Sequence, residues 1–439
     1  MSASVGIDVG TTSVKICAVD AQGSVVEEKS VIHNAWIKRN PLNYREQDAR
    51  KIFETIFILL SSMRATLRSV HSVAITGQMH GIIFWNCNAL AEGVFCCSPL
   101  ITWMDSRIPQ QFISTLPRWE LGDVHNGYGM VILAWLSSQS LIDPEWDRCG
   151  TIMDMLACYI TQLHRPLMGI QNAFSWGYCT REGDWTLTDD IVPSKLLPKI
   201  VPTGTIIGKV SCERVALPLG AKVFASLGDL QSTVYPLLSD GSAVLNLGTS
   251  AQLCFRYKGS DAFTSPLLTE PFFDGFHLIT AASMNGGNAV HLIAEKIIEW
   301  ASSLGSCNVD LHLDFKKFDG ILKSPSDNAS SLNVQPTFYE ERAEHSSSTI
   351  RGLLPDTTIT ELLHATAKGV ISNLNRLLPA NILRANGVTR LILAGNAGKA
   401  PYMRYISEIF EGFEVVEKTE AAESAAYGAA LFALRFNCT

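Results

Sequence analysis

The chain has 439 residues, 47% of them hydrophobic and 18% charged, with a net charge of −7 at pH 7. This length predicts two or three domains with well-packed cores, and the acidic balance disfavours binding to nucleic acid or to an anionic membrane. No window approaches the roughly 18 consecutive apolar residues of a membrane span, and the first twenty residues resemble a strand rather than a leader, so we expect a cytoplasmic protein that acts on small molecules.

The first predicted hairpin has an unusual corner. GIDVGTTSVKIC at 6–17 reads as two strands joined by Gly10, Thr11 and Thr12, with Asp8 two residues before the glycine. A glycine corner with threonine hydroxyls can direct N–H and O–H groups at an anion, so we predict a phosphate-binding loop. Asp8 keeps two interpretations of equal weight: a ligand of hydrated Mg²⁺, or a buried acid that bonds its own turn.

Alternating helix-like and strand-like segments follow, which is typical of layered α/β domains. Residues 46–67 place apolar side chains on one helical face, and 72–76 reads as a strand. Gln78, Met79 and His80 come directly after this strand, where side chains face a crevice at the carboxyl end of a sheet. A satisfied core histidine is the simpler interpretation of His80 taken alone.

Two further segments complete the first half of the chain. TWMDSR at 102–107 places Trp103 and Asp105 in one short loop, a mixture suited to stacking on a sugar and bonding its hydroxyls. A strand over 222–227 ends at Gly228, and Asp229 then starts a helix-like segment whose N–H groups can hold its charge. An ordinary N-cap is the simpler explanation of Asp229 alone, but its position before a second glycine corner favours a cleft.

That second corner repeats the first. VLNLGTSAQLCF at 244–255 again reads as strand, Gly-Thr-Ser and strand, and Gly248 lies about one domain length after the first corner. Two unrelated glycine hairpins are the alternative, but a duplication into two lobes predicts a corner at the start of each half.

Later segments add candidate ligand contacts on the same plan. SMNGGN sets Gly286 and Gly287 at a helix start, where backbone can approach a ligand closely, and 391–403 reads as strand, Gly395, polar loop with Asn396, and helix. Thr358 and Glu361 predict a capping box for a helix over 359–378. The stretch 303–350 is expected to be partly irregular, and 421–434 is expected to be a tightly packed helix of small residues.

These motifs, in this order, resemble the FGGY carbohydrate kinases of the actin, Hsp70 and hexokinase superfamily. The likeness rests on GIDVGTTSVK, YREQD, GQMHGIIFW, TWMDSR, QNAFSWGY, LGDLQSTVY, LNLGTSAQL and SMNGGN, which span most of the chain. It implies an α/β fold of two ribonuclease-H-like (actin/hexokinase-type) lobes with a central cleft. Residues 1–236 would form the sugar-binding lobe with the first phosphate loop and the catalytic acid, and residues 237–439 the nucleotide-binding lobe.

The resemblance also implies roles for individual residues. Asp229 would be the catalytic base, and Asp8 and Asp229 would surround Mg²⁺. The residues implied in sugar binding are Gln78, Met79, His80, Trp103, Asp105 and Asp229. Those implied in ATP binding are Gly10, Thr11, Thr12, Gly248, Thr249, Gly286 and Gly287, with Gly395 and Asn396 at the adenosine.

The expected reaction transfers the γ-phosphoryl of ATP to the terminal hydroxyl of a ketose. Sedoheptulose is the favoured substrate, and xylulose or another ketose is the alternative. A sugar and ATP are the expected partners, without nucleic acid or membrane, and no oligomeric state is predicted. An actin- or Hsp70-like ATP-driven switch is a hypothesis of another class, but it does not account for the sugar-type residues at 78–80 and 103–107.

Overall fold

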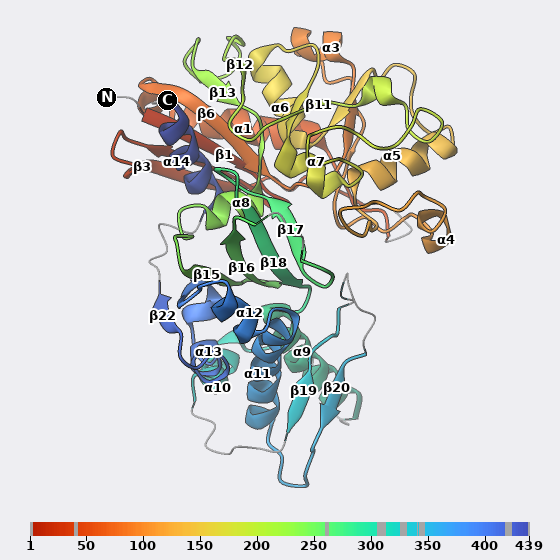
Figure 1. Cartoon of the computed structure of the whole chain (residues 1–439). Coiled ribbons are helices and arrows are strands. Elements are labelled where there is room, and N and C mark those ends of the chain that lie inside the picture. The colour runs from red at the N-terminus through yellow and green to blue at the C-terminus, as the bar shows by residue number, and fades with distance from the viewer. Residues whose placement is uncertain are drawn as a thin grey trace. The chain divides into compact units, whose positions relative to one another are not determined.

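The computed structural model describes residues 3–38, 43–259, 263–304, 313–324, 332–339, 341, 347–417 and 424–437. The chain divides into two units (Figure 1). Unit 1 comprises Met1–Pro236, Pro271–Gly275 and Ala421–Thr439, and unit 2 comprises Leu237–Glu270 and Phe276–Glu420. The sequence predicted one boundary, after residue 236. The structure differs from it in Pro271–Gly275 and Ala421–Thr439, which follow that boundary but belong to unit 1.

The main sheet of unit 1 has three antiparallel strands on one side and parallel strands on the other, with β12 antiparallel to β13 at the far edge. The order is β12-β13-β6-β1-β2-β3, and β14 also pairs with β6. Strands β1, β2 and β3 are antiparallel neighbours, whereas β6 runs parallel to β1, and β13 and β14 run parallel to β6. The bounds are β1 Ala3–Val9, β2 Ser13–Val19, β3 Val25–Ile32, β6 Val70–Gly77, β12 Ile206–Lys209, β13 Lys222–Phe224 and β14 Leu227–Gly228.

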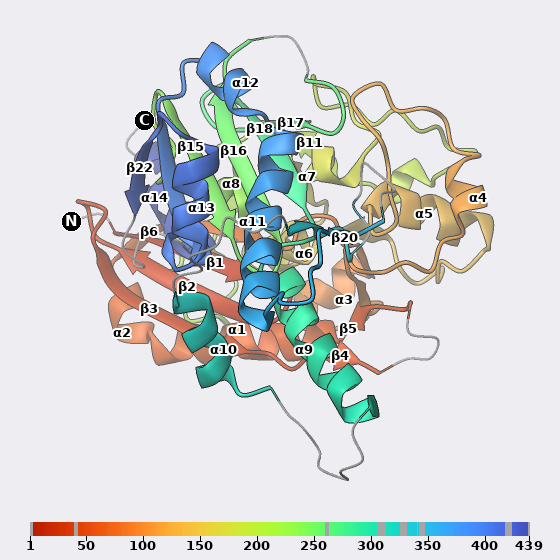
Figure 2. The ribbon, with the colours of Figure 1, turned by 90° about the horizontal axis from the view of Figure 1, so that it is seen from below.

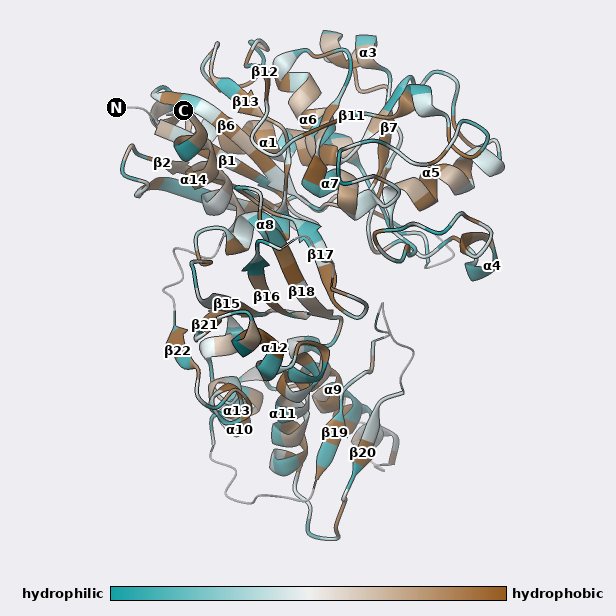
Figure 3. Ribbon diagram, viewed as in Figure 1, coloured by the Kyte–Doolittle hydropathy of each residue, from teal (hydrophilic) through white to brown (hydrophobic). Residues whose placement is uncertain are grey.

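The main sheet of unit 2 repeats this arrangement. Its order is β17-β18-β16-β15-β21-β22, with β18, β16 and β15 antiparallel and with β21 and β22 added in parallel. The bounds are β15 Ser242–Leu247, β16 Ala251–Tyr257, β17 Leu268–Pro271, β18 His277–Ser283, β21 Arg390–Gly395 and β22 Glu414–Glu417. Strands β16 and β18 are largely hydrophobic, as the brown ribbon in Figure 3 shows. The repeat of three antiparallel and two parallel strands confirms the two ribonuclease-H-like lobes.

Helices and short strands build the rest of unit 1. The helix predicted over 46–67 is two helices that meet at Met63, and Asp48 caps the first by accepting a hydrogen bond from the N–H of Arg50. The helices are α1 Ala49–Ser62, α2 Arg64–Leu67, α3 Cys87–Glu92, α4 Gln110–Ile113, α5 Gly129–Ser138, α6 Ile152–Thr161, α7 Ile170–Trp176, η1 Ser194–Leu196, α8 Asp229–Val234 and α14 Ala425–Asn437. The short strands are β4 Trp36–Ile37, β5 Glu46–Gln47, β7 Ile83–Trp85, β8 Leu100–Ile101, β9 Arg148–Gly150, β10 Leu167–Gly169 and β11 Lys199–Val201.

The C-terminal helix α14 packs tightly on the sheet of unit 1. A Cβ atom on Gly6 of β1 would lie 1.9 Å from the carbonyl oxygen of Ala426, and one on Gly428 would lie 1.8 Å from that of Ser232. Only glycine permits these approaches, because real Cβ contacts are essentially never that short. The small residues of α14 therefore serve helix packing, and this contact joins the helix to unit 1; the first three residues of the predicted stretch 421–434 lie outside the described residues.

Unit 2 adds α9 Gly287–Leu304, α10 Phe315–Lys323, α11 Ile359–Leu377, α12 Ala380–Ala385, η2 Asn396–Gly398 and α13 Tyr402–Ile409, and the strands β19 Asn333–Gln335 and β20 Thr349–Arg351. Helices α9 and α11 lie side by side (Figures 1 and 2). The predicted capping box is present at the start of α11. The segment 303–350 contains α10 and β19, and the remainder of it lies largely outside the described residues. No helix in the described part of the chain is both long and apolar enough to span a membrane.

Candidate active site

Three parallel strands of unit 1 end beside one another and bring the predicted acids together. Asp8 of β1 lies opposite Thr76 of β6, and Gly77 at the end of β6 pairs with Gly228 at the end of β14. The residues that follow β6 and β14 therefore emerge at the carboxyl edge of the sheet, next to Asp8. In α/β sheets this edge is where ligands bind.

Both acids are buried, and the negative charge of Asp229 acts on Asp8. The pKa of Asp8 is raised to about 7, first by burial and then by the negative charge of Asp229, while the positive charge of Lys15 lowers it. Burial likewise raises the pKa of Asp229 to about 6, against the effect of the Leu230 N–H, which donates to Asp229 Oδ1 at 2.8 Å. Two buried carboxylates, one of which feels the negative charge of the other, are suited to sharing a cation.

The same pair fits a magnesium ion. Asp8 Oδ1 is buried and has no hydrogen-bond partner among the described residues, so the structure gives no support to the interpretation that this oxygen bonds its own turn. Within the described ranges no cluster of three or more His, Cys, Asp or Glu side chains could hold a metal. Mg²⁺ commonly takes only one or two protein carboxylates and completes its shell with water and phosphate oxygens.

The first glycine corner is held by neighbouring side chains. The Gly10 N–H donates to the Ser13 carbonyl at 3.0 Å, which closes the turn. Trp103 Nε1 donates to Thr11 Oγ1 at 2.9 Å, and Gln47 Nε2 donates to the Thr11 carbonyl at 2.6 Å. The structure thus brings Trp103 to the corner, and it adds Gln47, for which the sequence predicted no role although it lies within the YREQD motif at 44–48.

Gln78, Met79 and His80 surround the end of β6. Gln78 is buried, and its Nε2 donates to Gln47 Oε1 at 3.1 Å. Met79 is buried against the α-carbon of Gly228. The His80 ring stacks on Tyr128 with centroids 4.8 Å apart.

The bond that His80 makes fixes its tautomer. Its Nδ1 lies 2.6 Å from the Ser175 carbonyl oxygen, and because a carbonyl can only accept, this nitrogen carries the proton. The ring is therefore held in a defined orientation. This orientation agrees with sugar binding by His80 and equally with a structural role in the core.

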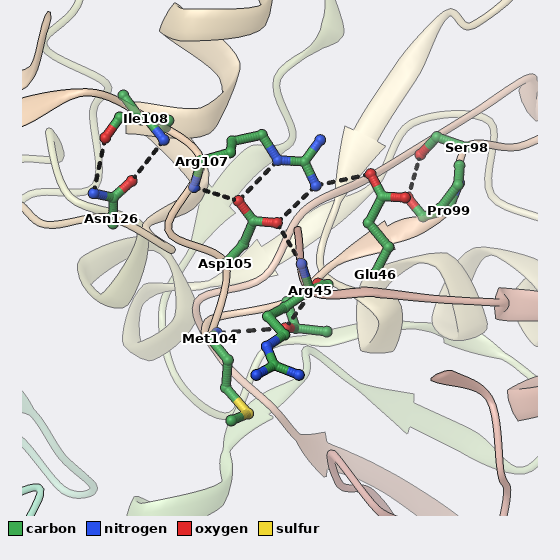
Figure 4. A network of polar contacts seen from close by, with 10 residues as sticks. Arg45, Glu46, Ser98, Pro99, Met104, Asp105, Arg107, Ile108 and Asn126 are labelled. Carbon is green, nitrogen blue, oxygen red and sulfur yellow. Dashed lines mark hydrogen bonds and ion pairs between the residues drawn. The ribbon is translucent and has the colours of Figure 1, made fainter. Parts of the chain in front are cut away.

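Asp105 is engaged entirely by protein donors (Figure 4). Its Oδ1 accepts from Arg107 Nε at 2.8 Å and from the Arg107 N–H at 3.1 Å. Its Oδ2 accepts from Arg107 Nη2 at 2.7 Å and from the Arg45 N–H at 2.8 Å. A carboxylate has about four acceptor positions, so Asp105 has none left to bond a sugar hydroxyl in this structure.

The Asp105 network instead fixes the loop that carries Trp103. Arg107 Nη2 also lies 2.7 Å from Glu46 Oε1, and the guanidinium carbon lies 4.0 Å from the ring centroid of Tyr44. These contacts join the 102–107 loop to β5, the strand that also carries Gln47. In this structure the bonds of Asp105 therefore hold the 102–107 loop in place.

The second glycine corner packs on the start of α9 in unit 2. The N–H groups of Gly287 and Asn288 donate to the carbonyls of Gly248 and Thr249 at 2.9 and 3.3 Å, and a Cβ on Gly286 would lie 2.4 Å from the Ser250 carbonyl carbon. Glycine is required here for backbone packing, and the Gly287 N–H is already used within the protein.

Gly395 closes the same region from β21. Its φ of +64° favours glycine, and a Cβ there would lie 2.6 Å from the Leu247 carbonyl oxygen. A pocket of about 370 Å³ brings together Gly248, Thr249, Gly287 and Asn396. A second pocket of about 490 Å³ shares Gly287 and Asn396 and adds apolar walls from Val290, Phe318, Leu322 and Tyr402. Together these pockets combine a polar end for phosphates with an apolar end suited to a base.

A duplicated ribonuclease-H-like fold with a hydroxyl-bearing glycine corner in each sheet is the arrangement expected of an ATP-binding protein, either a sugar kinase or a switch protein. Comparison with known proteins identifies the family to which the chain belongs. Residues 3–235 match the N-terminal domain of the FGGY family of carbohydrate kinases. The chain is 32% identical over 429 residues to the sedoheptulokinase of Mus musculus, covering 89% of both proteins. It is 25% identical to a xylulose kinase of Staphylococcus epidermidis, covering 79% of this chain and 70% of that one.

The fold comparison agrees. The crystal structure of xylulose kinase from Rhodospirillum rubrum superposes with a TM-score of 0.81 at 16% identity, over 98% of this chain and 89% of that one. The chain belongs to the FGGY family of carbohydrate kinases. It is an ATP-dependent sugar kinase, which confirms the predicted enzyme class and sets aside the hypothesis of a switch protein.

Proposed function

We propose that this kinase phosphorylates the terminal hydroxyl of sedoheptulose and releases sedoheptulose 7-phosphate and ADP. The choice of sedoheptulose rests on the 32% identity to a sedoheptulokinase over 89% of both chains. The identity to a xylulose kinase is 25%, over 79% of this chain and 70% of that one. Xylulose is the alternative substrate, because it is also a ketose with a terminal hydroxyl.

Asp229 is the proposed catalytic base. The Leu230 N–H occupies Asp229 Oδ1, which leaves Oδ2 to accept the proton of the sugar hydroxyl. With a pKa of about 6 the carboxylate is largely ionised at neutral pH, and a base with a pKa near the working pH is effective. Phosphoryl transfer passes through a loose transition state, so orienting the hydroxyl matters as much as accepting its proton.

Asp8 and Asp229 are the proposed holders of Mg²⁺. When bound, the ion would neutralise phosphate oxygens and help to align the reacting groups. The unpartnered Asp8 Oδ1 and the raised pKa values of the two acids support this assignment, since a cation relieves the cost of burying two neighbouring charges.

The two corners are the proposed phosphate contacts. In the part of the chain that the structure describes, the N–H groups of Thr11 and Thr12 and the hydroxyl of Thr249 make no hydrogen bond to protein, so they are available to phosphate oxygens. Gly10, Gly248, Gly286 and Gly287 would shape these turns. Gly395 and Asn396 would border the adenosine, since Asn396 lines both pockets of unit 2.

Gln78, Met79, His80 and Trp103 are the proposed sugar contacts. They gather around the end of β6 and the first corner, and Gln78 Oε1 is buried without a partner among the described residues. Asp105 is proposed to act indirectly, by holding the loop on which Trp103 lies. Such an arrangement separates the side chains that meet the sugar from the ion-pair network that supports them.

A coupled ADP-release assay tests the proposal on sedoheptulose, xylulose, ribulose, fructose and glycerol. We expect kcat/KM to favour sedoheptulose over xylulose by at least about tenfold, the scale of one well-made hydrogen bond. A higher kcat/KM for xylulose or glycerol would reject sedoheptulose as the substrate and leave the family assignment intact.

A further inference from the structure

Buried side-chain amides gather at the residue just before the proposed base. A Cβ on Gly228 would lie 2.2 Å from Gln231 Oε1 and 2.5 Å from Met79 Cε, so both side chains lie against this glycine. Its N–H donates to Gln171 Oε1 at 3.2 Å. Side chains from α7, α8 and the end of β6 therefore converge on the peptide that precedes Asp229.

Gln171 has an unsatisfied donor at this place. The residue is the second of α7 and is only 1% exposed. Its Oε1 is used by Gly228, but its Nε2 is buried and has no hydrogen-bond partner among the described residues. Gln78, 2% exposed, shows the complementary case: its Nε2 bonds Gln47, and its Oε1 is buried without a partner.

The unpartnered Gln171 donor and Gln78 acceptor, together with the Gln231 amide, whose Nε2 and Oε1 also lack partners among the described residues, are expensive features of a folded protein. Leaving a buried polar group unsatisfied costs about 1–3 kcal/mol, and most buried polar atoms in native proteins have partners. A hydroxyl group can both donate and accept. A polyhydroxylated chain bound beside Asp229 would therefore satisfy the Gln171 and Gln78 amides at once, which an apolar ligand could not do.

We propose that Gln171 is a specificity-determining residue that donates its Nε2–H to a hydroxyl of the bound ketose, while Gln78 Oε1 accepts from another. This inference rests on the proposed function, because it assigns residues to the sugar that the function requires. The Oε1 of Gln171 anchors Gly228, so the same side chain ties the sugar to the peptide that carries the base. A sugar lacking the matched hydroxyl would leave the Gln171 amide unpaired and lose that alignment.

Substitution can separate the acceptor function of the Gln171 Oε1 from the donor function of its Nε2. Gln171→Glu keeps an oxygen that accepts from the Gly228 N–H but replaces the donor by a second acceptor. Gln171→Met removes both. The matched control is Gln139→Met, which removes an exposed glutamine amide that, among the described residues, bonds Ser138 alone.

Steady-state kinetics on the full chain with sedoheptulose and with its analogues lacking one hydroxyl tests the proposal. We expect Gln171→Glu and Gln171→Met each to lower kcat/KM for the ketose at least about tenfold, equal to about 1.4 kcal/mol, with little change in the KM for ATP. One deoxy analogue should show a penalty of similar size in the wild type and almost none in either variant. Gln139→Met should behave as the wild type.

Two results would overturn the proposal. Wild-type kcat/KM in Gln171→Glu would mean that only the bond to Gly228 matters and that Gln171 has a structural role. A full penalty for every deoxy analogue in both variants would mean that Gln171 touches no sugar hydroxyl. Failure of the wild-type protein to phosphorylate any ketose would instead refute the proposed function, so the two failures are distinguishable.

Discussion

Replacing Asp229 by asparagine should abolish most of the phosphoryl transfer while leaving the fold intact. The Leu230 N–H at 2.8 Å can be accepted only by an oxygen, so the new amide must keep its Oδ1 there. Its NH₂ group then takes the place of Oδ2 and faces the sugar hydroxyl with a donor instead of an acceptor. The variant has the shape of the wild type and cannot receive the proton.

The size of the effect follows from the loss of a general base. Such a loss costs about 10² to 10⁴ in rate, which is about 3–5 kcal/mol at about 1.36 kcal/mol per factor of ten. The substitution should also change Asp8. Without the negative charge of Asp229, the pKa of Asp8 should fall below its present value of about 7. Turnover is measured by coupled ADP release, and sugar affinity by calorimetry without nucleotide.

The matched control is Asp154→Asn in α6. Asp154 is another buried carboxylate whose pKa burial raises to about 6, but it accepts from Thr151 and Ser226 within the protein. We expect near-normal turnover in this control. Turnover of Asp229→Asn within tenfold of the wild type, with sugar affinity retained, would refute the assignment of Asp229 as the base.

Four further outcomes can be checked. Thr249→Val should weaken ATP binding measured by calorimetry without changing sugar affinity, whereas Thr11→Val should weaken both, because Thr11 Oγ1 also accepts from the indole of the 102–107 loop; a loss of sugar affinity in Thr249→Val as large as that in Thr11→Val would contradict this contrast. Gly395→Ala should lower the free energy of unfolding by at least about 1–3 kcal/mol, and Gly387→Ala, which has positive φ but no neighbour within 4 Å, should cost less in the same denaturation experiment. His80→Ala should lower kcat/KM for the ketose with no matching loss of ATP affinity, and equal losses would argue for a role in folding alone. The Mg²⁺ concentration for half-maximal rate should rise as the pH falls from 8 to 6, because protons compete for two acids with pKa values of about 7 and 6; a constant requirement would exclude them as ligands.

The sequence predicted the features that depend on local pattern. The corner at Gly10, the second corner at Gly248, the capping box at Thr358 and the strand, glycine and helix around Gly395 are all present as expected. Each is encoded by residues within one or two turns of chain, where a glycine or a capping side chain has few alternative uses. The duplication was visible for the same reason, since both corners use the same local chemistry.

Contacts between distant residues were not predictable in this way. Asp105 appeared suited to a sugar because an acid and an aromatic residue share a short loop, but Arg107 and the Arg45 N–H occupy it. That pairing depends on β5 lying beside the loop, which no local pattern reveals. Gln47 was missed for the same reason, and the return of α14 to unit 1 depends on Gly6 and Gly428, glycines with unremarkable neighbours in the sequence.

The two corners also differ in a way that divides their chemistry. The residue two positions before the glycine is Asp8 in unit 1 and Asn246 in unit 2. Asn246 donates to Gln252 at 3.4 Å, a neutral contact across β15 and β16. A carboxylate at Asn246 would place negative charge beside the Gly248 corner, where it would repel a phosphate unless a cation were held there too. The duplication thus preserves in both sheets the turn proposed to receive phosphate, and it keeps in one of them the acid proposed to hold a metal.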